Sequence, residues 1–115
     1  AKDGEVIASA YNSQRSDLDA TAHDGIKAVA IAGKKLGDKD LIGCAVFCTH
    51  EPCTMCLSAM VFAKVEVVYY GISLDSVSEN HKRIRINAEE LLAKAPRPVR
   101  LVKGFMLDEI EKFNL

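Results

Sequence analysis

Two spacings of apolar residues recur along the chain, and together they predict helices alternating with strands. A helical period over residues 23–36 places apolar side chains on one face. A second apolar helix is expected over 53–63, directly after a proline that the start of a helix tolerates. A short apolar run at 44–49 and a β-branched, aromatic run at 65–70 predict buried strands.

The first twenty residues predict a hairpin turn, a strand and a loop. The Asp-Gly pair at 3–4 is typical of a two-residue hairpin turn, and residues 5–11 form the strand expected to leave it. Because only two residues precede that turn, the strand that should enter it is absent, and we expect the chain to be N-terminally truncated. Residues 12–21 form a polar loop, in which Asp19 or Thr21 is placed to cap the following helix.

The C-terminal third predicts one more strand between two short helices. Asn87 is a candidate N-cap with Glu90 three residues on, as in a capping box, and Pro96 ends that helix. Residues 99–105 alternate as a strand does, and 107–115 read as a last helix. Strands alternating with helices predict a single α/β domain with parallel strand pairs over residues 1–115.

Composition and charge limit the class of protein and its expected location. The chain has 115 residues, 49% hydrophobic and 27% charged, which suits one soluble domain with a single core. A formal net charge of -1 gives no overall attraction to a polyanion. No apolar run approaches the roughly 20 residues of a membrane span, and the first residues do not resemble a signal peptide. We therefore expect a cytoplasmic protein without a membrane partner, whose four cysteines are thiols or ligands.

Cys53 and Cys56 carry the chemistry that the sequence suggests first. They lie three residues apart where a helix begins, so both sulfurs project from one turn, and the helix dipole favours their thiolates. A C-x-x-C pair alone also fits a redox pair or half of a zinc knuckle. His23 offers a third ligand, and a site of two thiolates and one imidazole leaves a fourth position for water, as in catalytic zinc sites. Cys44 and Cys48 are interpreted as small buried hydrophobes.

The segments "TAHDG" and "EPCTMC" resemble the zinc signature of the cytidine deaminase superfamily, H-x-E followed by P-C-x-x-C. "GEVIASAYN", "GCAVFCTHEPCTMCLSAM" and "VVYYGIS" also match in order, most closely the branch with tRNA adenosine, guanine and nucleoside deaminases. The resemblance implies a three-layer α/β/α fold with a mixed, five-stranded sheet, here without its N-terminal helix and first strand. It also implies Zn²⁺ held by His23, Cys53 and Cys56, substrate contact by Asn12, and a homodimer.

Residue 25 departs from that pattern. The superfamily has there a glutamate that moves protons, whereas this chain has Gly25, without a turn that requires glycine. Positioned acid–base groups contribute about 10²–10⁴-fold to a rate. Asp24 is a weak substitute at best, because one helical residue rotates about 100° from the required direction. Glu51 is expected to cap or pack at the cysteine helix.

The sequence thus predicts a zinc-dependent hydrolytic deaminase of a nucleobase or nucleoside, impaired at Gly25. A small-molecule substrate is favoured over tRNA because the chain has no basic stripe, and a tRNA adenosine deaminase is the alternative. A non-catalytic zinc-binding subunit of a deaminase is a second alternative. A thiol redox protein is disfavoured because it leaves His23 without a role.

Overall fold

The computed structural model describes residues 1–2, 4–10, 14–73 and 84–104. Helices and strands alternate after the first helix, as the sequence predicted. Their order is α1 (Gln14–Asp17), α2 (Asp24–Leu36), β1 (Ala45–His50), α3 (Thr54–Phe62), β2 (Val67–Ile72), α4 (Ala88–Ala93) and β3 (Arg100–Val102). Within these ranges no helix is long and apolar enough to cross a membrane.

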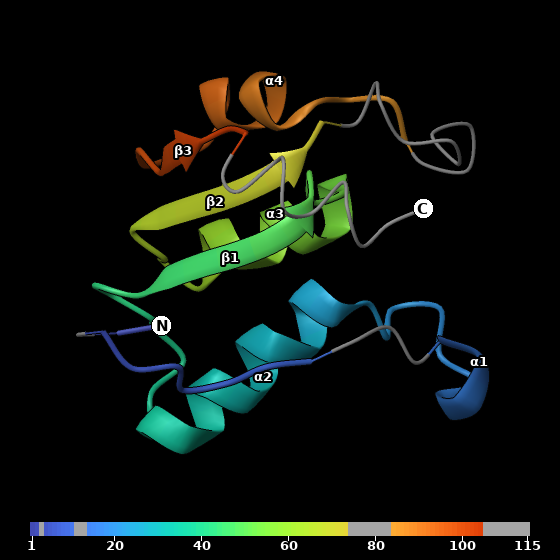
Figure 1. Cartoon of the computed structure of the whole chain (residues 1–115), viewed down its shortest axis with the longest axis vertical. Coiled ribbons are helices and arrows are strands. Elements are labelled where there is room, and N and C mark those ends of the chain that lie inside the picture. Colours follow the sequence, from blue (N-terminus) through green and yellow to red (C-terminus); the bar gives the residue numbers. More distant parts are fainter. Residues whose placement is uncertain (3, 11–13, 74–83, 105–115) are drawn as a thin grey trace.

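The described sheet has three strands in the order β1-β2-β3, and both pairs are parallel. Each parallel pair is joined through a helix, α3 and then α4, as parallel strands require. Figure 1 shows the strands side by side, with α2 beyond the β1 edge of the sheet. The α/β class is therefore confirmed, and the described part of the sheet is parallel rather than mixed.

One face of the sheet carries the core. Val68 and Tyr70 of β2 pack there with Leu57 and Met60 of α3, all almost fully buried. Helix α3 in turn packs against α2 and α4. The described residues thus form two layers, a sheet and the helices on one of its faces. The helix expected over 107–115 lies outside the described residues.

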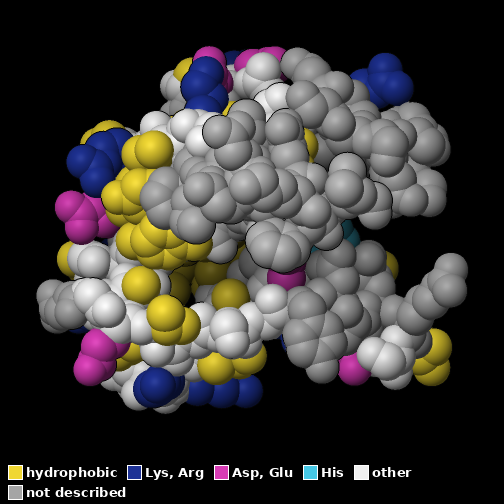
Figure 2. All heavy atoms as spheres, in the orientation of Figure 1, with side chains coloured by type: hydrophobic (Ala, Val, Ile, Leu, Met, Phe, Trp, Pro, Cys, Tyr) yellow, Lys and Arg dark blue, Asp and Glu magenta, His cyan; other side chains and the backbone are white. Residues whose placement is uncertain are grey.

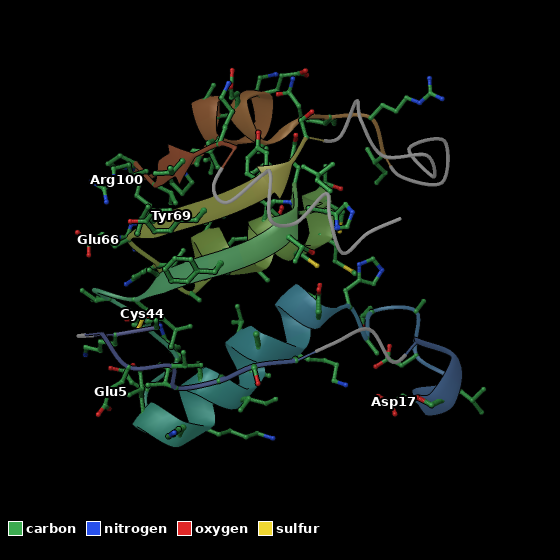
Figure 3. All side chains as sticks on the ribbon, viewed as in Figure 1. Glu5, Asp17, Cys44, Glu66, Tyr69 and Arg100 are labelled. Carbon is green, nitrogen blue, oxygen red and sulfur yellow. The ribbon has the colours of Figure 1, made fainter. Side chains whose placement is uncertain are left out.

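The opposite face of the sheet carries aromatic side chains. The rings of Phe47 and Tyr69 stack with centroids 4.7 Å apart. On the neighbouring strand Arg100 lies beside Tyr69 (Figure 3), and its Nη2 donates a hydrogen bond to the Tyr69 hydroxyl at 3.4 Å. Since Phe47 and Tyr69 are register partners on β1 and β2, their stack supports the pairing of these two strands.

The hairpin turn at the start is present, but within the strand expected over 5–11 the described residues, 5–10, form no strand. Lys2 and Glu5 exchange two backbone hydrogen bonds of 2.9 Å around a turn in which Gly4 has φ 80°. Ala1 pairs in the same reciprocal way with Ala45, at 2.6 and 2.8 Å. Beyond that pair a cavity of about 410 Å³ separates residues 6–10 from β1. Residues 6–10 have no ladder partner among the described strands and therefore form no strand.

Three smaller expectations also need correction. Residues 14–17 of the predicted loop form α1. The second strand begins at Val67 instead of residue 65 and continues through Gly71, because its pairing with β1 extends to Ile72. The predicted cap of α2 is wrong, because the residue at that position is His23.

Candidate metal centre

Two helix N-termini meet at the predicted metal ligands. His23 is the N-cap of the 13-residue α2, and Cys53 is the N-cap of the nine-residue α3. Cys56 is the third residue of α3, and N-cap and third-residue side chains lie on the same side of a first turn. The C-x-x-C spacing therefore brings both sulfurs to one helix start.

Asp19 and Thr21 form the turn that positions His23 at the start of α2. The Asp19 carboxylate accepts hydrogen bonds from the Thr21 backbone N–H at 2.8 Å and from its hydroxyl at 2.7 Å. These bonds lower the pKa of Asp19, the hydroxyl bond having the largest effect. The His23 backbone N–H then donates to the Thr21 carbonyl. Since the His23 side chain makes no capping bond, its ring is available to face α3.

The structure brings the three predicted ligands together. One ligand atom from each of His23, Cys53 and Cys56 lies within 4.8 Å of the other two. The Cys53 Sγ is 3.5 Å from the His23 Nδ1. Zn–S and Zn–N bonds of about 2.3 and 2.1 Å at a tetrahedral angle place such atoms about 3.6 Å apart. The donor set and this separation both fit a zinc ion.

The two cysteines differ in their affinity for a proton. The pKa of Cys53 is lowered to about 5, mainly because the Cys56 side chain hydrogen-bonds it, with His23 adding a favourable charge. The pKa of Cys56 is raised by that same bond and by burial. A thiolate beside a thiol at a helix N-terminus suits metal capture. By contrast, burial raises the pKa of Cys48 to about 12, in keeping with a plain apolar role.

Position 25 faces the metal ligand Cys56, and the space that a side chain there would occupy is already filled by Cys56 and Met60. Gly25 is buried in the first turn of α2. A Cβ built there would lie 2.9 Å from the Cys56 Cβ, 3.1 Å from its Sγ and 3.1 Å from the Met60 Cε. No turn in the sequence explains a glycine here, whereas the structure supplies a reason in the close approach of α3. Met60 was missed as a neighbour, although it lies one helical turn after Cys56 on the same face.

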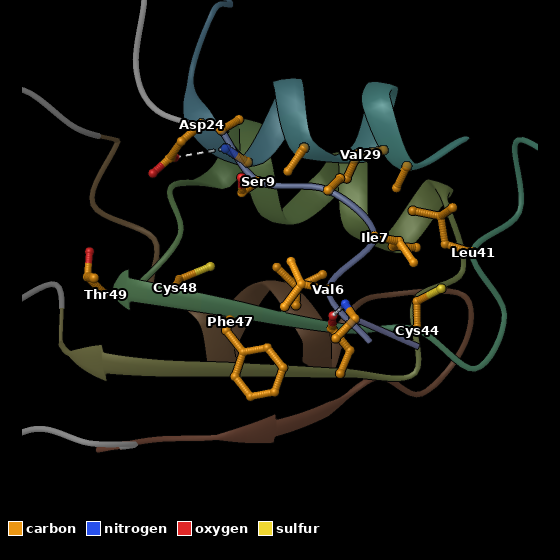
Figure 4. Close-up of a pocket in the computed structure, with 18 residues that line it drawn as sticks. Val6, Ile7, Ser9, Asp24, Val29, Leu41, Cys44, Phe47, Cys48 and Thr49 are labelled. Carbon is orange, nitrogen blue, oxygen red and sulfur yellow. Dashed lines mark hydrogen bonds between the residues drawn. The ribbon is translucent and has the colours of Figure 1, made fainter. Parts of the chain in front are cut away.

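Asp24 is turned toward its own helix. Its carboxylate accepts a hydrogen bond of 2.8 Å from the Gly25 backbone N–H, drawn as a dashed line in Figure 4. The side chain is exposed and is not one of the three clustered ligands. Asn12, the predicted substrate contact, lies outside the described residues.

Glu51 has a partner that the sequence did not indicate. It is buried, and its Oε2 accepts a 2.7 Å hydrogen bond from the backbone N–H of Ala88 at the start of α4. It therefore supports the start of α4. Burial and the Glu51 carboxylate raise the pKa of Tyr70 to about 12. A carboxylate at a helix N-terminus is favourable, but the sequence does not show which helix.

Known proteins are similar to this chain over most of its length. The family profile described as MafB19-like deaminase matches residues 1–108. The tRNA-specific adenosine deaminase of Agrobacterium fabrum is 44% identical over 69 residues, which cover 60% of this chain and 45% of that protein. The guanine deaminase of Bacillus subtilis is 36% identical over 78 residues, which cover 68% and 50%. The matched stretch thus spans about half the length of these relatives.

Among solved structures, one from a study of A-to-I editing by tRNA:A34 deaminases superimposes with a TM-score of 0.80 at 28% identity. The superposition covers 97% of this chain and 79% of that one. Its extent agrees with the α/β fold and places the chain among deaminases of known architecture.

Proposed function

The chain belongs to the MafB19-like deaminase family, within the cytidine deaminase superfamily, and on this premise we propose that it is a zinc-dependent hydrolytic deaminase of a nucleobase or nucleoside with impaired proton transfer. The observation that carries the proposal is the convergence of His23, Cys53 and Cys56 at two helix N-termini. When bound at such a three-ligand site, Zn²⁺ supplies a Lewis acid that acidifies a coordinated water.

Each ligand is set by its own element. The turn at Asp19 and Thr21 fixes His23, and the first turn of α3 fixes both sulfurs. The lowered pKa of Cys53, caused mainly by its bond with Cys56, keeps a thiolate ready at neutral pH. These residues bind and orient the metal, whereas Gly25 has no atom that can hold or move a proton.

The substrate class is proposed from the relatives. The guanine deaminase of Bacillus subtilis supports a small purine, and the absence of net positive charge agrees with it. A tRNA adenosine is the alternative, favoured by the extent of the superposition on the tRNA:A34 deaminase structure. A homodimer in the cytoplasm stays a prediction from the sequence.

A non-catalytic zinc-binding subunit is the second candidate. The close approach of Cys56 and Met60 to position 25 favours it, because even the Cβ of a side chain there would require Cys56 to shift. In that case the domain would bind zinc and substrate without turnover.

The test combines zinc analysis with ammonia release. The purified chain and its Cys56→Ser variant are assayed on guanine, adenosine, cytosine, cytidine and a tRNA anticodon stem, beside the Bacillus subtilis guanine deaminase. We expect the native chain to bind one equivalent of zinc and the Cys56→Ser variant to lose it. We expect the native chain to release ammonia about 10²–10⁴-fold more slowly than the comparison enzyme. Zinc without release from any compound would favour the non-catalytic subunit. A chain that takes up no zinc would contradict both proposals.

A further inference from the structure

We propose that Gly25 is a positioning residue for the metal centre: because it has no side chain, the first turn of α2 rests directly on Cys56, and this contact sets the Cys56 sulfur relative to His23 and Cys53. The effect on the metal rests on the proposed function, whereas the helix contact does not. The glycine would then be a built-in part of this site as well as the loss of an acid–base group.

The contact is between parts of the fold that have little room to retreat. Gly25 is buried, Cys56 is 3% exposed and Met60 is not exposed at all. The Met60 Cε is the far end of a flexible side chain and can move aside. The Cys56 Cβ, 2.9 Å from a Cβ built at position 25, is fixed to the backbone of α3. The contact with Cys56 is therefore the one that excludes a side chain.

A neighbouring backbone group shows the same close approach. The backbone of Ile26, next along the first turn of α2, lies close enough to the Cys56 thiol to interact with it. The first turn of α2 thus lies close to the Cys56 side chain at two successive residues.

A side chain at position 25 has consequences for ligand geometry. Either α2 and α3 separate, or Cys56 turns away. His23 lies on the α2 side of the contact and Cys53 on the α3 side, so both adjustments change distances among the three ligands. A contact below 3.0 Å needs a shift of some tenths of an ångström, comparable with the tolerance of about 0.2 Å in metal–ligand distances. A glutamate at position 25 would therefore not simply restore the superfamily pattern.

The decisive variant is Gly25→Ala, because helix propensity predicts that it raises the Tm, whereas the contact with Cys56 predicts that it lowers the Tm. Propensity alone favours alanine over glycine inside a helix. We expect instead a lower Tm for the metal-free variant and a zinc affinity reduced about 10–100-fold, as for other residues that orient metal ligands. Zinc affinity is measured by competition with a chromophoric chelator. Ala30→Gly, at an exposed position of the same helix, calibrates propensity and should leave zinc affinity unchanged.

A double-mutant cycle isolates the contact without metal. Cys56→Gly removes the Cβ against which residue 25 packs, so Gly25→Ala should lower the Tm in the native background and raise it in the Cys56→Gly background. If Gly25→Ala alone does not fold, recovery of folding in the double variant gives the same answer. A higher Tm for Gly25→Ala in both backgrounds would overturn the contact.

The positioning role has its own contrary results. Unchanged zinc affinity in Gly25→Ala, or tighter zinc binding by Gly25→Glu, would overturn it. A native chain that binds no zinc would refute the proposed function and the positioning role with it, whereas the metal-free cycle would still decide the helix contact.

Discussion

Glu51 is a buried carboxylate in the loop between β1 and the cysteine helix. Only 3% of it is exposed, and its hydrogen bond to Ala88 joins this loop to α4, 37 residues further along the chain. A buried acceptor that satisfies a helix N-terminus holds both segments in place. The loop that leads to Cys53 is thereby anchored at its buried end.

Replacing Glu51 therefore tests how firmly that loop is held. Glu51→Ala leaves the Ala88 N–H buried without its acceptor, so the free energy of unfolding should fall by about 1–3 kcal/mol. Glu51→Gln keeps an acceptor oxygen and should lose clearly less. Urea denaturation of the metal-free proteins measures both. An alanine variant as stable as the glutamine variant would show that the hydrogen bond to Ala88 contributes nothing.

Among individual residues, local motifs were predictable and distant contacts were not. Cys53 and Cys56 are suggested by their spacing and His23 by the family resemblance, and the structure does bring the three together. The partner of Glu51 and the tight packing at Gly25 depend on elements that only the fold brings near. No local pattern around either residue specifies such a neighbour.

At the scale of elements, helices α2 and α3 were predicted nearly to the residue, whereas the short helix α1 was missed. Helix α2 spans Asp24–Leu36 where 23–36 was expected, and Asn87 caps α4 by accepting the Glu90 N–H at 2.8 Å. Helical periods and side-chain caps such as Asn87 act within about one turn, so the local sequence can show them. Helix α2 has no such side-chain cap, and its start was assigned the wrong residue. Strands depend on a partner: β2 extends to Ile72 because it pairs with His50, and residues 6–10 lack a ladder.

At the scale of the whole molecule, one hollow stands out. The cavity of about 410 Å³ lies between residues 6–10, helix α2 and strand β1. Figure 2 shows hydrophobic side chains gathered around this hollow, and Figure 4 places Asp24 and Cys48 at one end and Leu41 and Cys44 at the other. Apolar walls that do not touch one another forfeit packing energy.

Filling that cavity should stabilise the chain. Ala28 of α2 lines it, so Ala28→Leu is expected to raise the free energy of unfolding by about 1 kcal/mol. Ala30→Leu, on the exposed side of the same helix, provides the matched control and should change little. Thermal unfolding followed by circular dichroism compares the two. Equal shifts for both variants would mean that the leucine at 28 does not fill the cavity.

The central claim is that α2 and α3 bring His23, Cys53 and Cys56 into one metal centre, and a Co²⁺ titration of the metal-free chain tests it most directly. Cobalt replaces zinc at such sites and reports its ligands by absorption. The account predicts saturation at one equivalent, with thiolate charge-transfer bands and intense tetrahedral d–d bands that weaken in Cys56→Ser and His23→Ala. A spectrum without thiolate bands, or one that those substitutions leave unchanged, would contradict it.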